Sequence, residues 1–265
     1  MMLKSEEIQR YQEHGYVVPD FRLPDDFLVE MREAYARLIA NNSHISADFM
    51  LAPHLETGSS QGLIGNKEWL EFATYRPLLD MAADLIGEDI ILWGTTLFGK
   101  PANGGKETPW HQDGDYYPIR PLETMTIWIP LDDVSLDNGP MRFIPGSHKA
   151  RQTFSHSWVE GEELTINLVT DDEYFDESTA ENLIIDAGQV SYHDVYMIHG
   201  SYANNTNRRR AAMVVRLMPA SSLYDHALGT EMGKKHAAHG YGDRALFLVR
   251  GKDIHGGNNF EIGHP

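Results

Sequence analysis

The chain has 265 residues, with 22 lysines and arginines against 39 aspartates and glutamates, so its formal net charge is −17. Such an acidic chain is repelled by a phosphate backbone, which argues against nucleic acid as a partner. Because the chain has no cysteine, disulfides, zinc–thiolate sites and iron–sulfur clusters are excluded, and any metal must be held by nitrogen and oxygen.

The first part of the chain, residues 1–88, is predicted to be helical. Ser5 can cap a short first helix. A second, longer helix is expected over residues 24–42, where apolar residues recur at steps of three and four on one face after a proline. A third apolar pattern runs over residues 77–87 and ends at a glycine. We expect these helices to cover the outside of a β core rather than to form a partner-binding module.

Over residues 89–218 the pattern changes to short runs of β-branched and aromatic residues divided by Gly, Pro, Asn and Asp, which predicts a sandwich or barrel. Within this region, residues 149–182 are predicted to be an inserted acidic loop, and loops of that length are often lids or binding loops. Residues 219–265 lack periodicity and are expected to be coil with a short helix near Glu231. We expect one domain over residues 1–265.

The segment PWHQDGDYYP places His111 and Asp113 two positions apart. On extended backbone, residues i and i+2 point to the same side, so both side chains can reach one metal ion. The pair alone is more simply interpreted as a solvated turn. His199, in the later segment MIHGS, is a candidate third ligand. Two histidines and one carboxylate leave three metal positions open, which is the arrangement of non-haem iron(II) oxygenases.

Open positions on ferrous iron require a co-substrate that supplies electrons, and a bidentate 2-oxo acid can do so. Its far carboxylate suits the planar guanidinium of an arginine. Arg210 follows His199 by eleven positions and enters the same pocket if the Asn-rich turn between them reverses the chain. Ser201 can add a hydroxyl to that carboxylate. Arg208 and Arg209 are more simply interpreted as a solvated basic patch.

Together these segments resemble the phytanoyl-CoA dioxygenase family of Fe(II)- and 2-oxoglutarate-dependent oxygenases. The matching motifs are a WHxD segment, the stretch WIPLDDVSLDNGPMRFIPGSH, a distal His-Gly-Ser and the following arginine. The resemblance implies a mainly β fold with α elements (α+β), a cupin-like double-stranded β-helix or jelly roll with N-terminal helices packed outside. It also implies Fe(II) bound by His111, Asp113 and His199, with 2-oxoglutarate bridging the iron and Arg210, and O2 as the oxidant.

Halogenating relatives in this family replace the metal carboxylate by a small residue, so Asp113 favours hydroxylation. We expect Trp110, Trp128 and Phe143 to wall the cavity, and we group Trp128 with the residues that bind the co-substrate. His193 precedes the third metal ligand by six positions and is interpreted as structural.

Residues just after the His-x-Asp motif often contact substrate in this family, which nominates Asp115, Tyr116, Tyr117 and Arg120. Tyrosines beside an acidic group suit an ammonium cation. Arg120, Arg142 or Lys106 would instead suit a carboxylate or phosphonate. We therefore expect hydroxylation of an unactivated C–H bond in a small polar metabolite, such as an aminophosphonate or an amino acid-like zwitterion, with release of succinate and CO2.

Two alternatives remain at this stage. An acyl-CoA-type substrate would require an apolar groove, which the polar stretch DGDYYPIR does not indicate. A cupin-type protein that binds another divalent ion without oxygenase chemistry would give Arg210 and Ser201 no role. No apolar run approaches the length of a membrane span and the N-terminus is too polar for a signal peptide, so we expect a cytoplasmic enzyme without a membrane partner. The sequence leaves the oligomeric state undetermined.

Overall fold

The computed structural model describes residues 2–57, 59–236 and 240–264, apart from the side chains of residues 115, 116, 235 and 236. Within these ranges the α-helices are α1 (Ser5–His14), α2 (Asp25–Asn41), α3 (Glu68–Ala73), α4 (Arg76–Ile86) and α5 (His226–His236). In this described part of the chain, no helix has both the length and the apolar character that a membrane span requires.

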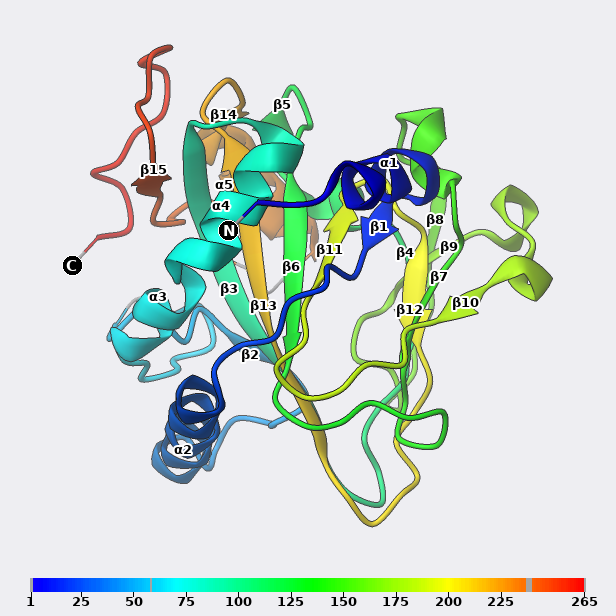
Figure 1. Ribbon diagram of the computed structural model, residues 1–265. Helices are drawn as coiled ribbons and strands as arrows, with labels where there is room; N and C mark the ends of the chain where they lie inside the picture. Colours follow the sequence, from blue (N-terminus) through cyan, green and yellow to red (C-terminus); the bar gives the residue numbers. More distant parts are fainter. Residues whose placement is uncertain (1, 58, 237–239, 265) are drawn as a thin grey trace.

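Two antiparallel sheets form the core (Figure 1). The large sheet has the order β1-β11-β6-β13-β3-β15, and β2 also pairs with β3. Its strands are β1 (Tyr16–Val17), β2 (Met50–Leu51), β3 (Ile90–Lys100), β6 (Met125–Pro130), β11 (Ser191–Asp194), β13 (Arg210–Pro219) and β15 (Phe247–Arg250). The small sheet has the order β10-β7-β12-β4 and consists of β4 (Thr108–His111), β7 (Met141–Phe143), β10 (Glu181–Asn182) and β12 (His199–Ser201).

The two faces of β13 serve different purposes, because successive residues on a strand point to opposite sides. One face packs against the N-terminal helices in the main hydrophobic core, through Ala211, Met213, Val215 and Leu217 together with residues such as Met31 and Leu78. The opposite face packs toward the small sheet through Ala212 and Val214. Arg210 and Arg216 have the same parity as these two residues and stand at the two ends of this inner face. The helical layer outside a β core is therefore as expected.

The ends of the N-terminal helices follow the predicted signals with one difference. The N-cap of α1 is Lys4, not Ser5, because the Glu7 carboxylate accepts a hydrogen bond from the Lys4 backbone nitrogen at 2.7 Å. α2 follows Pro24 directly and α4 ends at Gly87. The short α3 was not predicted.

Two regions expected to be irregular contain additional structure. The insert over residues 149–182 holds the antiparallel pair β8 (His156–Trp158) and β9 (Leu168–Thr170), followed by two 3₁₀ helices, Asp172–Tyr174 and Glu177–Thr179. In the C-terminal region α5 contains Glu231 as expected, but the prediction of coil elsewhere is wrong. β14 (Leu223–Tyr224) pairs with β5 (Ile119–Arg120), and β15 extends the large sheet beside β3.

Candidate active site

Three potential metal ligands meet between the two sheets. His111 ends β4, Asp113 begins the 3₁₀ helix η1 (Asp113–Tyr116), and His199 begins β12. One ligand atom from each lies within 4.8 Å of those of the other two, and all three residues are buried. β4 and β12 are paired so that His199 stands opposite His111. Gln112, between the first two ligands, is extended (φ −113°, ψ 129°), which preserves the predicted same-side relation although the strand itself ends at His111.

Hydrogen bonds orient each ligand. Nδ1 of His111 lies 2.9 Å from the Pro109 carbonyl, and Nδ1 of His199 lies 3.0 Å from the Met197 carbonyl. Each Nδ1 can donate to its carbonyl, which leaves Nε2 with a lone pair for a metal. Thr126 donates its hydroxyl to Oδ2 of Asp113 at 3.1 Å. The set of two imidazoles and one carboxylate, with outer partners in place, fits a ferrous ion.

The charge states also suit coordination. Burial lowers the pKa of His111 to about 3, with a further contribution from His199, so its imidazole is neutral near neutral pH. Burial alone would raise the pKa of Asp113, but His199 and Arg216 hold it well below its usual value. A neutral imidazole and an ionised carboxylate are the forms that bind metals.

Arg210 lies in the same cavity as the triad, at the start of β13. It is only 2% exposed, and its guanidinium carbon lies 5.4 Å from the centre of the Trp128 ring. Nη2 donates to the Gly139 carbonyl, whereas the buried Nε has no hydrogen-bond partner in the described part of the chain. Burial lowers its pKa to about 10. Ser201, at the end of β12, lines the same cavity.

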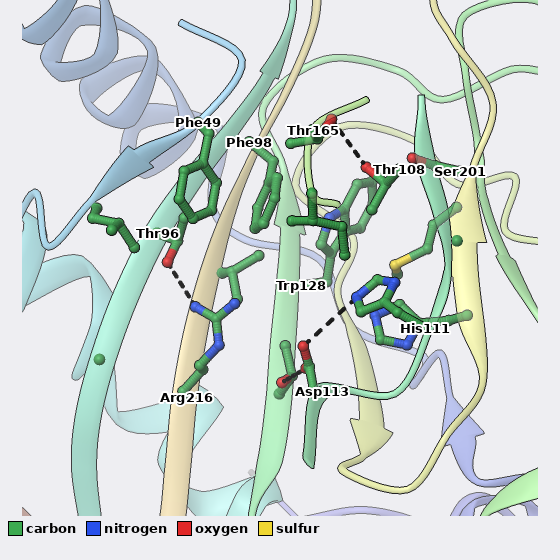
Figure 2. A pocket seen from close by; sticks show the side chains of 18 of the residues that line it. Phe49, Thr96, Phe98, Thr108, His111, Asp113, Trp128, Thr165, Ser201 and Arg216 are labelled. Atoms are coloured by element: carbon green, nitrogen blue, oxygen red, sulfur yellow. Dashed lines mark hydrogen bonds and ion pairs between the residues drawn. The ribbon is translucent and has the colours of Figure 1, made fainter. Parts of the chain in front are cut away.

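The cavity is lined by both sheets, the insert and the C-terminal region, and has a volume of about 100 Å³. Figure 2 shows Asp113 between His111 and Arg216, with Thr108, Trp128 and Ser201 around them. The insert contributes Thr165 and Ile166 to the wall.

The family model for phytanoyl-CoA dioxygenase (PhyH) matches residues 11–212. The chain belongs to this family. It is 24% identical over 246 residues to the peroxisomal phytanoyl-CoA dioxygenase of Homo sapiens, covering 86% of this chain and 72% of that protein. It is 31% identical over 202 residues to a probable alpha-ketoglutarate-dependent hypophosphite dioxygenase of Stutzerimonas stutzeri, covering 76% of this chain and 63% of that protein.

Solved structures share the fold. The non-heme monooxygenase ThoJ superimposes with a TM-score of 0.69 at 23% identity, covering 92% of this chain and 84% of that chain. EctD from S. alaskensis, solved with 2-oxoglutarate and 5-hydroxyectoine, gives a TM-score of 0.68 at 20% identity, covering 84% and 78%. The predicted cupin-like α+β fold is thereby confirmed. Family membership and the buried triad also confirm the predicted enzyme class, a non-haem Fe(II)- and 2-oxoglutarate-dependent dioxygenase of the PhyH family.

The expected substrate residues of this PhyH-family member lie in different places. Tyr117 is buried and lines the cavity. Arg120 is exposed and donates to the carbonyls of Tyr117 and Ile119. Arg142 lies over the rings of Trp110 and Tyr202 and pairs with the Glu177 carboxylate at 2.6 Å. Neither arginine lines the cavity, nor does Lys106. The side chains of Asp115 and Tyr116 lie outside the described part of the chain.

Several cavity residues were missed in the sequence. Lys100 pairs in register with Arg210, is buried, and donates to the Lys106 carbonyl. Burial, and then the nearby Arg210, lower the pKa of its ammonium to about 6. The other missed residues include Arg216 and Arg244.

His193, interpreted from sequence as structural, stands in the wall of the site. Its Nε2 lies 3.9 Å from Oδ2 of Asp113, and its ring centre lies 4.9 Å from that of His199. Neither ring nitrogen has a hydrogen-bond partner among the described residues. Burial holds its pKa well below the usual value, so this imidazole is uncharged beside the triad.

Proposed function

We propose that this dioxygenase hydroxylates an unactivated C–H bond in a small polar metabolite, for example an aminophosphonate or an amino acid-like zwitterion. One atom of O2 enters the substrate as hydroxyl and the other enters succinate, while 2-oxoglutarate loses CO2. The observation that carries the proposal is that a buried arginine, Arg210, which forms no ion pair with any described carboxylate, shares one cavity with the His111, Asp113 and His199 triad.

Each residue has a defined part in this proposal. The iron, when bound, supplies the activation of O2 and the cleavage of the C–H bond. His111 and His199 present Nε2, and Thr126 orients the Asp113 carboxylate. Arg210 holds the far carboxylate of 2-oxoglutarate by charge-assisted hydrogen bonds.

Other side chains complete the co-substrate site and the cover of the cavity. Trp128 lies beside the arginine and Ser201 lines the same cavity, and we assign both to the co-substrate site. We assign Tyr117, which accepts a hydrogen bond from Arg216, to the substrate side. Thr165 and Ile166 belong to the insert, which we expect to close over the substrate and exclude water.

The charged groups of the cavity and one relative support a small polar substrate. Arg216 and Arg244 line the cavity together with the triad, and guanidinium groups suit an anionic ligand better than a fatty acyl chain. The relative at 31% identity is named for hypophosphite, a small anion, whereas the human relative is named for phytanoyl-CoA. An acyl-CoA substrate is therefore kept as the alternative.

Turnover screening tests the proposal. Purified protein, Fe(II), 2-oxoglutarate and O2 are incubated with a panel of aminophosphonates, betaines, amino acids and acyl-CoA thioesters, and succinate is measured with the hydroxylated product. We expect stoichiometric succinate and hydroxylated product from a small polar compound. Product from an acyl-CoA alone would establish the alternative, and no 2-oxoglutarate binding or turnover under any condition would overturn the oxygenase function.

A further inference from the structure

Arg216 is a second cavity arginine, on the same inner face of β13 as Arg210 but six residues farther along the strand. Its Nε donates to the Tyr117 hydroxyl at 2.7 Å, and its Nη1 donates to the Thr96 hydroxyl at 2.6 Å. Both partners are neutral. Nη2 makes no hydrogen bond to any residue of the described chain, and no carboxylate there lies within 4.0 Å of the guanidinium.

The charge of Arg216 is therefore only indirectly balanced. Burial opposes its charge, but Tyr117 and Asp113 act in the opposite direction and the pKa of the guanidinium is raised. Asp113 is the nearby acid, and its charge is shared with the metal once iron binds. A charged group in a largely buried site is stable when an opposite charge is close. These surroundings suit an arginine whose positive charge is balanced by a bound anionic ligand.

A second guanidinium reaches the same place from the C-terminal region. Arg244 is 7% exposed and lines the cavity. Its Nη1 would lie 3.7 Å from a Cβ atom built on Gly94, and Gly94 is the register partner of Arg216 on β3. Two guanidinium groups beside one glycine can together bind an oxyanion by charge-assisted hydrogen bonds.

This site is separate from the co-substrate site. Six residues of extended strand place the Cα atoms of Arg210 and Arg216 on the order of 20 Å apart. Arg216 stands opposite Thr126 on β6, the residue that orients Asp113, whereas Arg210 stands against Trp128 and Gly139.

The cavity is also rich in cations although the chain is acidic. Its charged lining comprises Arg210, Arg216 and Arg244 against Asp48 and the metal ligand Asp113, whereas Lys100, with a pKa of about 6, is largely neutral near neutral pH. Asp48 accepts hydrogen bonds from Ser46 and from the backbone of Lys106, and it raises the pKa of Lys100. It therefore belongs to the Arg210 end of the cavity, because Lys100 is the register partner of Arg210.

We propose that the substrate carries a small oxyanion group, a carboxylate or a phosphorus oxyanion, and that Arg216 and Arg244 bind this group on the side of the triad away from Arg210. The proposal rests on the proposed function, because it names the substrate class of the same site. It replaces Arg120, Arg142 and Lys106 as the expected anion-binding residues with two arginines that line the cavity.

A binding experiment tests this assignment without requiring turnover. Protein loaded with Fe(II) and saturated with 2-oxoglutarate is titrated without oxygen, by calorimetry, with hypophosphite, methylphosphonate, acetate or trimethylamine. We expect the oxyanions to bind and trimethylamine not to bind. Comparing the dissociation constants of hypophosphite and methylphosphonate with that of acetate shows whether the substrate carries a phosphorus oxyanion or a carboxylate.

Matched variants locate the site. Arg216→Gln is expected to weaken oxyanion binding roughly ten- to a hundredfold, since a charged hydrogen-bond donor is lost, while the dissociation constant for 2-oxoglutarate stays the same. Gly94→Asp places a carboxylate beside both arginines and should compete with the oxyanion. Gly94→Asn has nearly the same volume without the charge and should weaken binding less. Arg208→Gln, at an exposed position, should change neither affinity.

Each other result has a defined meaning. If the wild-type protein binds metal and 2-oxoglutarate but prefers trimethylamine or binds no oxyanion, the anion site is refuted and the oxygenase proposal stands. If 2-oxoglutarate does not bind at all, the proposed function fails first. If Arg216→Gln weakens 2-oxoglutarate instead of the oxyanion, Arg216 belongs to the co-substrate site and the assignment is wrong. Should Arg216→Gln fail to fold, the difference between Gly94→Asp and Gly94→Asn decides, and equal binding by that pair contradicts the proposal.

Discussion

Nε2 of His111 lies 3.8 Å from Oδ1 of Asp113, although one side chain leaves the end of a strand and the other the start of a 3₁₀ helix. His111 uses Nδ1 and Asp113 uses Oδ2 for hydrogen bonds. Nε2 of His111 and Oδ1 of Asp113 therefore remain as metal ligands and point toward each other. An arrangement of this kind is favourable when a cation lies between the two atoms.

Removal of the carboxylate should therefore remove the metal. Asp113→Ala is expected to abolish substrate-dependent succinate formation and to lower the iron content of the purified protein, because two imidazoles alone bind ferrous iron weakly. Iron analysis and succinate assays check this. Asp172→Ala, at an exposed acidic position, is the matched control and should behave as the wild type. Full activity of Asp113→Ala would refute its assignment as a ligand.

Arg210→Ala should raise the concentration of 2-oxoglutarate required for half-maximal turnover roughly ten- to a hundredfold, because the far carboxylate loses its charged partner. Initial rates measured against 2-oxoglutarate concentration check this, with Arg208→Ala as the control. An unchanged requirement would exclude Arg210 from the co-substrate site.

Gly200, the middle residue of the His-Gly-Ser motif, is required by close packing between β12 and β4. A Cβ atom there would lie 2.9 Å from the Thr108 carbonyl oxygen and 3.2 Å from that of Pro109, which orients His111. Gly200→Ala is expected to displace this backbone and to weaken iron binding about tenfold or more, the usual effect of disturbing an outer-shell partner.

An iron titration checks the Gly200 prediction. Gly233→Ala is the matched control, because a Cβ atom at Gly233 meets nothing within 4 Å among the described residues. Equal iron affinity of the Gly200 and Gly233 variants would show that the close contact has no effect on the triad.

His54 should make the protein less stable in acid. Burial, with Arg244 and His264 adding to it, lowers the pKa of its imidazole from 6.5 to about 3. Below pH 6.5 the unfolded chain takes up a proton that the folded chain excludes, so the free energy of unfolding falls as the pH falls toward 3. A shifted pKa changes the free energy of unfolding by about 1.4 kcal/mol per pH unit. Between about pH 7.5 and pH 5, the free energy of unfolding should therefore decrease by about 2 kcal/mol less in His54→Gln than in the wild type.

Urea unfolding of metal-free protein at the two pH values measures this difference. Loss of the hydrogen bond that Nδ1 of His54 shares with the Thr95 hydroxyl at 2.7 Å affects the variant at both pH values, so it leaves the difference between them unchanged. His44→Gln, at an exposed position, is the control and should follow the wild-type curve. Parallel curves for all three proteins would contradict the assignment of a neutral buried His54.

The sequence predicted the elements that have strong local signals. Extended backbone at Gln112 and the eleven-residue step from His199 to Arg210 are local or nearly local relations, so they could be derived without coordinates. Arg216 had a usable signal that was missed, since period-two alternation along β13 gives it the same face as Arg210. Arg244 had none, because its segment has no periodicity and reaches the cavity only through tertiary packing. Arg120 was nominated by proximity in sequence to the motif, but its backbone turns it toward solvent.

The inner face of β13 also bears on which atom is oxidised. Arg210 and Arg216 belong to one paired strand in the middle of a sheet, so the backbone fixes their separation. The metal triad lines the same cavity as both arginines. A substrate held by its anionic end would have its reactive bond selected by the number of atoms from that end. A homologue longer by one methylene would then present the next carbon along its chain, and the regiochemistry would shift with it.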